Sequence, residues 1–129
     1  QMKKLESIND RRRILAERYI RQLQHIPSIK FQQIPEGFVH SWQMFTIVVP
    51  DAIRDGLLHY LRSNGVEASV HFDPPIHEQS VYRNLKQGGS LETAQKISKS
   101  LITLPLFPDM KSVEVDMICE LIENFKGLR

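Results

Sequence analysis

The chain has 129 residues and a mass of 15.0 kDa, and its 17 lysine and arginine residues exceed its 15 aspartate and glutamate residues by two. Its 41% hydrophobic and 25% charged residues are ordinary for a folded soluble domain and exclude a disordered or collagen-like chain. No run approaches the roughly 20 apolar residues of a membrane helix. A single cysteine, Cys119, lies in an apolar rhythm, which indicates a buried thiol in a reducing compartment. We therefore expect one soluble, cytoplasmic domain over residues 1–129, with no membrane partner.

Charge is concentrated at the start of the chain. Residues 1–30 carry eight basic and three acidic residues, whereas residues 31–129 carry nine basic and twelve acidic residues. The run Arg11-Arg12-Arg13 could mark a nucleic-acid footprint. Acidic side chains interleave with these cations at near-helical spacing, however, and no aromatic platform accompanies them. A solvated helix face or a protein interface is favoured, and no nucleic-acid partner is expected.

The first segment has apolar residues at three- and four-residue steps, which predicts one amphipathic helix from residue 1 to about residue 25, ended before Pro27. A helix of this length is longer than a small domain needs. We expect residues 1–26 to be a connector from another domain of a longer protein, and residues 27–129 to be a small α/β domain.

Strands and helices then alternate. A short extended piece near residues 31–34 precedes an apolar stretch over residues 41–49, which predicts a central strand covered on both faces. The next helix is expected to begin with Asp51 as its N-cap and to stop at Asn64-Gly65. Strict alternation over residues 66–72 then predicts a strand, with Val66, Ala68, Val70 and Phe72 on one face.

The last third predicts a loop over residues 83–90, a helix capped by Ser90 that runs to about residue 100, and a strand over residues 101–104. A closing amphipathic helix follows, with Gly127 at its end and with the apolar face Val115, Ile118, Leu121, Ile122 and Phe125. The fold class is therefore α+β, a small and mainly antiparallel sheet of about three strands packed by helices.

Chemistry-bearing side chains gather at His71, Asp73, His77 and Tyr82, in a segment that Pro74-Pro75 makes stiff. Two histidines and a carboxylate could ligate a metal, but the spacing matches no zinc motif and a third firm ligand is missing, so no metal is expected. Alternatively, His71 is a half-buried strand residue bonded to a backbone carbonyl, and His77 caps the next helix. Spacing alone does not define a reaction.

The segment from His71 to Arg83 resembles the signature His-Tyr-x-Pro-Pro-Ile/Leu-His-x-Gln-x-x-Tyr of the DegT/StrS-type nucleotide-sugar aminotransferases. Further motifs agree in order along the chain. They are the initial Gln-x-x-x-Leu helix, Ser41 to Phe45, Asn64-Gly65-Val66, Leu104 to Met110, and Glu114-Val115-Asp116. The resemblance covers essentially all 129 residues.

This resemblance implies the small C-terminal domain of a fold type I enzyme similar to aspartate aminotransferase. The lysine that forms the Schiff base with pyridoxal phosphate would then lie outside this chain, which would hold no catalytic residue. The implied reaction moves an amino group, usually from glutamate, onto a keto-sugar carried by a nucleotide, in polysaccharide or antibiotic sugar biosynthesis. The implied partners are these substrates, the missing large domain and a second subunit of a homodimer.

The matched substrate-binding positions are His71, Phe72, His77 and Tyr82. Phe72 stands where the family usually has tyrosine, and Gln43 stands where it commonly has histidine. The isolated chain is expected to be inactive and to bind no coenzyme. Two alternatives with the same fold are a non-catalytic regulatory or ligand-binding module and a dehydratase-like relative.

Overall fold

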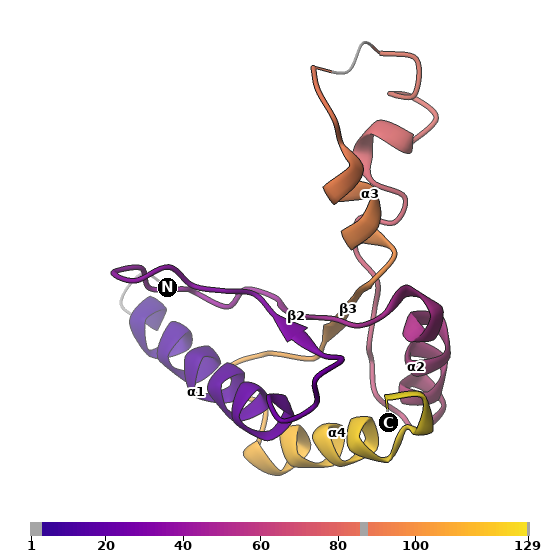
Figure 1. The fold of residues 1–129 in the computed structure, drawn as a ribbon. Coiled ribbons are helices and arrows are strands. Elements are labelled where there is room, and N and C mark those ends of the chain that lie inside the picture. The colour runs from indigo at the N-terminus through magenta and orange to yellow at the C-terminus, as the bar shows by residue number, and fades with distance from the viewer. Residues whose placement is uncertain (1–3, 86–87, 129) are drawn as a thin grey trace.

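A computed structural model describes residues 4–85 and 88–128 of the protein. Figure 1 shows helices and strands that alternate along the chain around a small sheet. In order, the elements are α1 (Leu5–Leu23), β1 (Lys30–Phe31), β2 (Phe45–Val48), α2 (Asp51–Ser63), the 3₁₀ turn η2 (Ile76–Glu78), α3 (Glu92–Ser98), β3 (Leu101–Leu104), α4 (Ser112–Asn124) and the 3₁₀ turn η3 (Lys126–Leu128).

The sheet is antiparallel with strand order β1-β2-β3, which confirms the predicted fold class. The register pairs Lys30 with Val48 and Phe45 with Leu104. The strand predicted over residues 41–49 is central but shorter. It is fully buried only on the side of Phe45 and Ile47, whereas its other face is half-buried. The physical reason is that α1 and α4 pack beneath the same face of the sheet (Figure 1).

The second half of α1 belongs to the core of the domain. Its buried stripe consists of Leu15, Ala16, Tyr19 and Leu23. The Tyr19 ring is fully buried and stacks on Phe45, with ring centroids 4.8 Å apart and an interplanar angle of 16°. The Tyr19 hydroxyl donates a hydrogen bond to the carbonyl oxygen of Pro105 at 3.1 Å. The helix is therefore fixed to the sheet and to the loop after β3, while Leu5 and Ile14 of its first half stay exposed.

Helix α2 begins differently from the prediction and ends as predicted. Pro50 occupies the N-cap position, and its carbonyl oxygen accepts the amides of Ile53 and Arg54. Asp51 is therefore not the cap but the first helical residue, where its negative charge still suits the helix dipole. At the other end, Gly65 has φ +80°, and the Val66 amide donates to Leu61 at 3.0 Å. This is the left-handed stop that Gly65 predicts.

The strand predicted over residues 66–72 is wrong in extent. Ser69 and Thr103 exchange two backbone hydrogen bonds, of 3.0 and 2.8 Å, as an isolated bridge beside β3. Ala68 is buried as predicted, but Phe72 is 63% exposed and has φ +61°. The chain leaves the sheet here because Pro74 and Pro75 have no backbone N–H to donate to a neighbouring strand.

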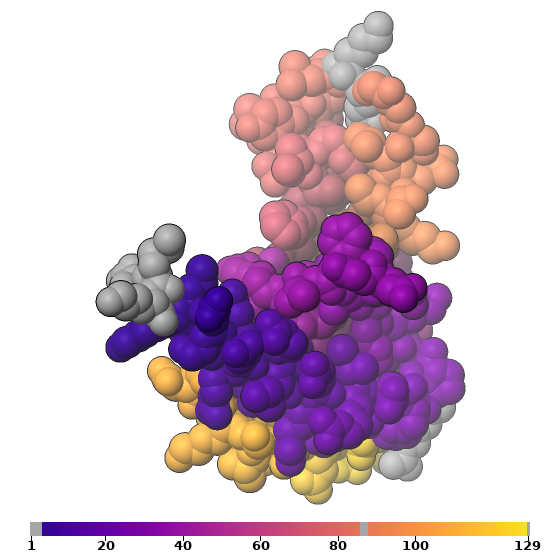
Figure 2. All heavy atoms as spheres, turned by 90° about the vertical axis from the view of Figure 1, so that its left-hand side faces the viewer, coloured from indigo at the N-terminus to yellow at the C-terminus, as the bar shows by residue number. Residues whose placement is uncertain are grey.

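Residues 70–85 and 88–98, here called the arm, project from the body of the domain and carry η2 and α3 (Figures 1 and 2). The predicted helix from Ser90 to residue 100 is shorter, Glu92–Ser98, and the Ser90 hydroxyl accepts the Glu92 amide at 3.5 Å.

The chain then returns to the body through β3 and closes with α4, which buries Val115, Ile118 and Ile122 as predicted. This helix ends at Asn124, and Gly127 lies in η3 beyond it. Within the described residues, no helix combines the length and the apolar character needed to cross a membrane.

Candidate functional site

His71 lies where the arm leaves the body. Its Nδ1 is 2.8 Å from the hydroxyl oxygen of Thr103 and 3.4 Å from that of Ser69. The predicted partner, a backbone carbonyl, is wrong, because the bridge between Ser69 and Thr103 places two hydroxyl groups beside the ring. These contacts orient the imidazole through one nitrogen. Its Nε2 makes no hydrogen bond within the described residues, so it is available to a ligand.

Arg54 of α2 contacts the same junction and is a residue that the sequence analysis did not single out. It is only 8% exposed, and its Nη2 donates to Oδ2 of Asp73 at 2.6 Å. Its Nε forms an ion pair with Asp55 at 2.7 Å, without hydrogen-bond geometry. A signal was present, because Arg54 occupies the helical stripe of α2 that continues with Leu57 and Leu61. A buried cation at such a position requires a carboxylate or another acceptor as its partner.

Phe72 follows His71, with ring centroids 6.3 Å apart, and is the first of several exposed apolar side chains on the arm. Together with α3 it lines a pocket of about 430 Å³. The apolar lining residues of this pocket are Phe72, Pro75, Leu91, Ala94, Ile97 and Leu101. The arm therefore offers an aromatic ring and an apolar hollow next to an oriented imidazole.

His77 and Tyr82 lie further out on the arm. His77 is the middle residue of η2, so its predicted role as a cap of the next helix is wrong. Its side chain is 14% exposed, and its Nε2 is buried, 3.9 Å from Glu78 Oε1 and without a hydrogen-bond partner among the described residues. Tyr82 follows in a turn and is 44% exposed. The structure places all four predicted residues on the arm and brings the rings of His71 and Phe72 together.

The metal alternative gains no support from this geometry. Residues 4–85 and 88–128 contain no group of three His, Cys, Asp or Glu side chains that could hold a metal ion. Asp73 is paired with Arg54, and Nδ1 of His71 with Thr103, so these two residues offer a metal ion little beyond Nε2 of His71.

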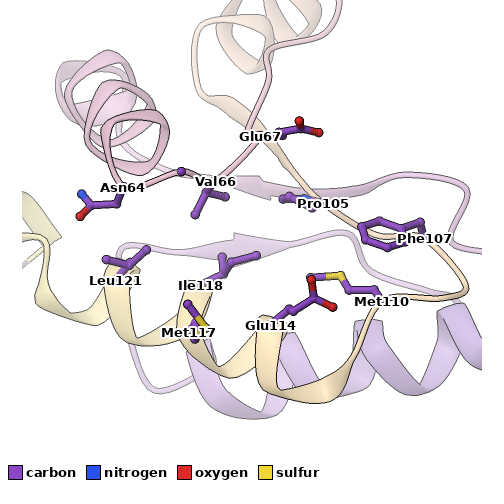
Figure 3. A pocket seen from close by; sticks show the side chains of 11 residues that line it. Asn64, Val66, Glu67, Pro105, Phe107, Met110, Glu114, Met117, Ile118 and Leu121 are labelled. Carbon is purple, nitrogen blue, oxygen red and sulfur yellow. The ribbon is translucent and has the colours of Figure 1, made fainter.

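A second pocket, of about 300 Å³, lies between the turn after α2 and helix α4 (Figure 3). Met110, Ile118 and Leu121 contribute to its wall. Its polar side chains are Asn64, Glu67 and Glu114, of which Glu114 accepts the Lys111 amide at 2.6 Å as part of the start of α4. Met110 is 1% exposed. The motif from Leu104 to Met110 therefore builds the core and this wall, and it does not contribute to the arm.

A third hollow, of about 900 Å³, lies between the edge of the sheet, the start of α2 and α3. It is lined by three lysines, Lys30, Lys96 and Lys99, and by the carboxylates of Asp51 and Glu92. The mixed charge and the exposure of these side chains give no single binding preference.

Two of the arginines of α1 form ion pairs within the chain. Arg13 pairs with Asp10 at 2.8 Å, and Arg18 donates two bonds of 2.6 Å to Asp116 of α4. The hydrogen bonds from Arg18 and then from Gln22 lower the pKa of the Asp116 carboxyl. These pairs favour the predicted protein-facing helix over a nucleic-acid footprint.

Cys119 is buried at 1% exposure, and burial raises the pKa of its thiol to about 12. The thiol is therefore part of the packing, as its apolar surroundings in the sequence predict.

Solved structures that resemble this fold are aminotransferases. One from Brucella abortus superimposes with a TM-score of 0.87 at 25% identity, over 98% of this chain and 33% of its own. TlmJ from Streptoalloteichus hindustanus gives 0.84 at 24% identity, over 95% and 32%. PseC from Helicobacter pylori, involved in pseudoaminic acid biosynthesis, gives 0.86 at 21% identity, over 98% and 35%. The chain thus has the fold of one part of an aminotransferase and spans about a third of the length of these proteins.

The amino-acid sequence identifies the family of this chain. The chain belongs to the DegT/DnrJ/EryC1/StrS aminotransferase family, whose sequence pattern matches residues 1–123. The expected family and the expected fold are both confirmed.

Proposed function

We propose that the chain is the small domain of a pyridoxal-phosphate-dependent aminotransferase that transfers an amino group, usually from glutamate, to a keto-sugar carried by a nucleotide. The observation that carries the proposal is the family match over residues 1–123, together with a span of about a third of the matched structures. Residues 1–26 are then the connector, whose second half packs into the core of the small domain formed with residues 27–129.

The lysines of residues 4–85 and 88–128 do not fit the role of a Schiff-base lysine for the coenzyme. Every lysine of the described part, including the three beside the 900 Å³ hollow, is exposed. A Schiff-base lysine needs a low pKa, which desolvation or a neighbouring cation provides. The coenzyme, which supplies the electron sink of amino transfer, therefore belongs to the remainder of the enzyme. The contribution of this chain is to position the substrate and exclude water from it.

The arm is the substrate-facing element of the proposal. His71 is oriented through Nδ1 by Thr103, which leaves Nε2 to bond a sugar hydroxyl or a diphosphate oxygen. Phe72 offers a ring for apolar packing but lacks the hydroxyl that tyrosine would bring. His77 and Tyr82 extend the same surface outward. Because the apolar side chains of the arm are exposed in this chain, we further propose that the large domain and a second subunit of a homodimer cover them.

The test uses the full-length enzyme that contains this chain. His71→Ala is expected to raise KM for the nucleotide-sugar about tenfold, the effect of one lost hydrogen bond to a charged or hydroxyl group, and to leave pyridoxal phosphate affinity unchanged. His59→Ala, at an exposed position of α2, is the matched control. Equal losses of sugar and coenzyme affinity would show that His71 is structural.

A second measurement concerns the coenzyme. The 129-residue chain mixed with pyridoxal phosphate is expected to show neither the visible absorbance of the bound coenzyme nor amino transfer. A bound band that borohydride traps on one of its lysines contradicts the assignment of the coenzyme to the remainder of the enzyme. A full-length enzyme that eliminates water from the sugar without transferring nitrogen would instead be the dehydratase-like relative.

A further inference from the structure

The junction between the arm and the body is held by three contacts in sequence. Ser69 forms its backbone pair with Thr103, His71 bonds the Thr103 hydroxyl, and Asp73 pairs with Arg54. The first two contacts tie the arm to β3, and the third ties it to α2. Ser69 and His71 precede Phe72 in the chain, and only Asp73 follows it.

Phe72 explains why a contact on each side matters. Its φ of +61° is an outlier for a bulky side chain, and such a conformation persists only when the surrounding structure determines it. The His71–Thr103 hydrogen bond fixes the chain immediately before Phe72, and the Arg54–Asp73 pair fixes it immediately after. Releasing Asp73 removes the constraint on one side, so the direction in which the arm leaves the body is no longer set.

Arg54 is a firm anchor because of its own environment. Its side chain is 9% exposed, and Nη1 has no hydrogen-bond partner among the described residues. A buried guanidinium is unfavourable unless its N–H groups have acceptors, so loss of the 2.6 Å hydrogen bond from Nη2 opposes withdrawal of Asp73. Asp55 also contacts Arg54, but its side chain is 85% exposed and it belongs to α2 itself. Asp55 therefore neutralises charge without fixing the arm.

We propose that Arg54 and Asp73 are positioning residues that set the direction of the arm and thereby place His71 and Phe72 against the nucleotide-sugar. The role of His71 and Phe72 as substrate contacts rests on the proposed function. Neither Arg54 nor Asp73 needs to touch the substrate, because their effect passes through the two residues that precede Asp73 in the chain.

The experiment compares Asp73→Asn with Asp55→Asn in the full-length enzyme. Both variants remove one carboxylate from the same guanidinium, but only the first releases the arm. For Asp73→Asn we expect about a 10- to 100-fold loss in kcat/KM for the nucleotide-sugar, the size of effect that a misplaced substrate contact produces. The amino-donor half-reaction and coenzyme affinity should be unchanged. Asp73→Glu, which keeps the carboxylate, should restore most of the loss and guards against a misfolded asparagine variant.

Hydrogen exchange of the segment that contains Ser69 and His71 is the second readout. We expect at least tenfold faster exchange in Asp73→Asn and no change in Asp55→Asn. Equal effects of the two variants, or equal losses in both half-reactions, would overturn the inference. If the unmodified enzyme transfers no amino group to any nucleotide-sugar, the proposed function fails and the substrate role of the pair fails with it. The hydrogen-exchange measurement would then still decide whether the Arg54–Asp73 pair holds the arm.

Discussion

Removal of the Tyr19 hydroxyl tests whether α1 is fixed to the core or only passes over it. In Tyr19→Phe the ring and its stacking on Phe45 are retained, while the hydrogen bond to Pro105 is lost. Tyr19 is fully buried and Pro105 is half-buried, so the variant loses one partly buried hydrogen bond. The cost is about 1–2 kcal/mol, and Tyr19→Ala, which also removes the ring, should cost about 3–5 kcal/mol.

The assay is urea and thermal unfolding of the 129-residue chain, followed by circular dichroism. At about 4 °C per kcal/mol for a domain of this size, Tyr19→Phe should lower Tm by about 4–8 °C and should shift the urea midpoint without changing the slope m. Tyr60→Phe is the matched control. Tyr60 is half-buried against Phe125, and its hydroxyl makes no hydrogen bond among the described residues.

The control variant should change stability by less than about 0.5 kcal/mol. If Tyr19→Phe and Tyr60→Phe are equally mild, the hydroxyl of Tyr19 does not fix α1. If Tyr19→Ala is equally mild as well, the assignment of the second half of this helix to the core is refuted.

Two further predictions concern titratable groups. Because the folded-state pKa of Asp116 is lowered, its contribution to stability is present above the unfolded value of about 3.9 and is lost as pH falls through the folded value. The difference in urea midpoint between the parent chain and Asp116→Asn should therefore be constant from about pH 7 to 5 and vanish at lower pH; a difference that grows on acidification would contradict this reasoning. It should also be small and should weaken with salt, because the Asp116 side chain is 38% exposed. Cys119, buried and with its pKa raised to about 12, should resist a thiol reagent at pH 8 in the native chain and react fully in urea, and rapid native labelling would show that the α4 side of the core opens.

Local signals in the sequence located most of the elements. The strand over residues 101–104 and the stop at Gly65 follow from β-branched residues, flanking prolines and the φ that glycine permits. The pattern of the closing helix likewise gave its buried face. Asp51 was misjudged as a cap because the side-chain rule favours aspartate at that position, whereas this helix begins one residue earlier than expected, with Pro50 at the N-cap and no side-chain cap.

In the candidate site, too, the sequence located the segment but not its long-range contacts. The motif from His71 to Arg83 marked the arm, but the spacing could not reveal that His71 bonds Thr103, which lies 32 residues further along the chain. Nor could it show that Phe72 leaves the face of Ala68, since that depends on where the chain leaves the sheet. Arg54 went unnoticed because its partner Asp73 is 19 residues away, on a different element.

The sequence by itself determined the α+β class, the family and the position of the chemistry-bearing segment, because periodicity, turn residues and motifs are properties of neighbours along the chain. Only the tertiary structure decided which face of β2 is covered, that Tyr19 joins α1 to the loop at Pro105, and that Arg54 holds the arm. Each of these depends on a contact between distant segments, whose partner is chosen by packing and charge balance in three dimensions. The length of 129 residues suffices for a core. Comparison with the solved structures was needed to show that it spans only about a third of the matched aminotransferases.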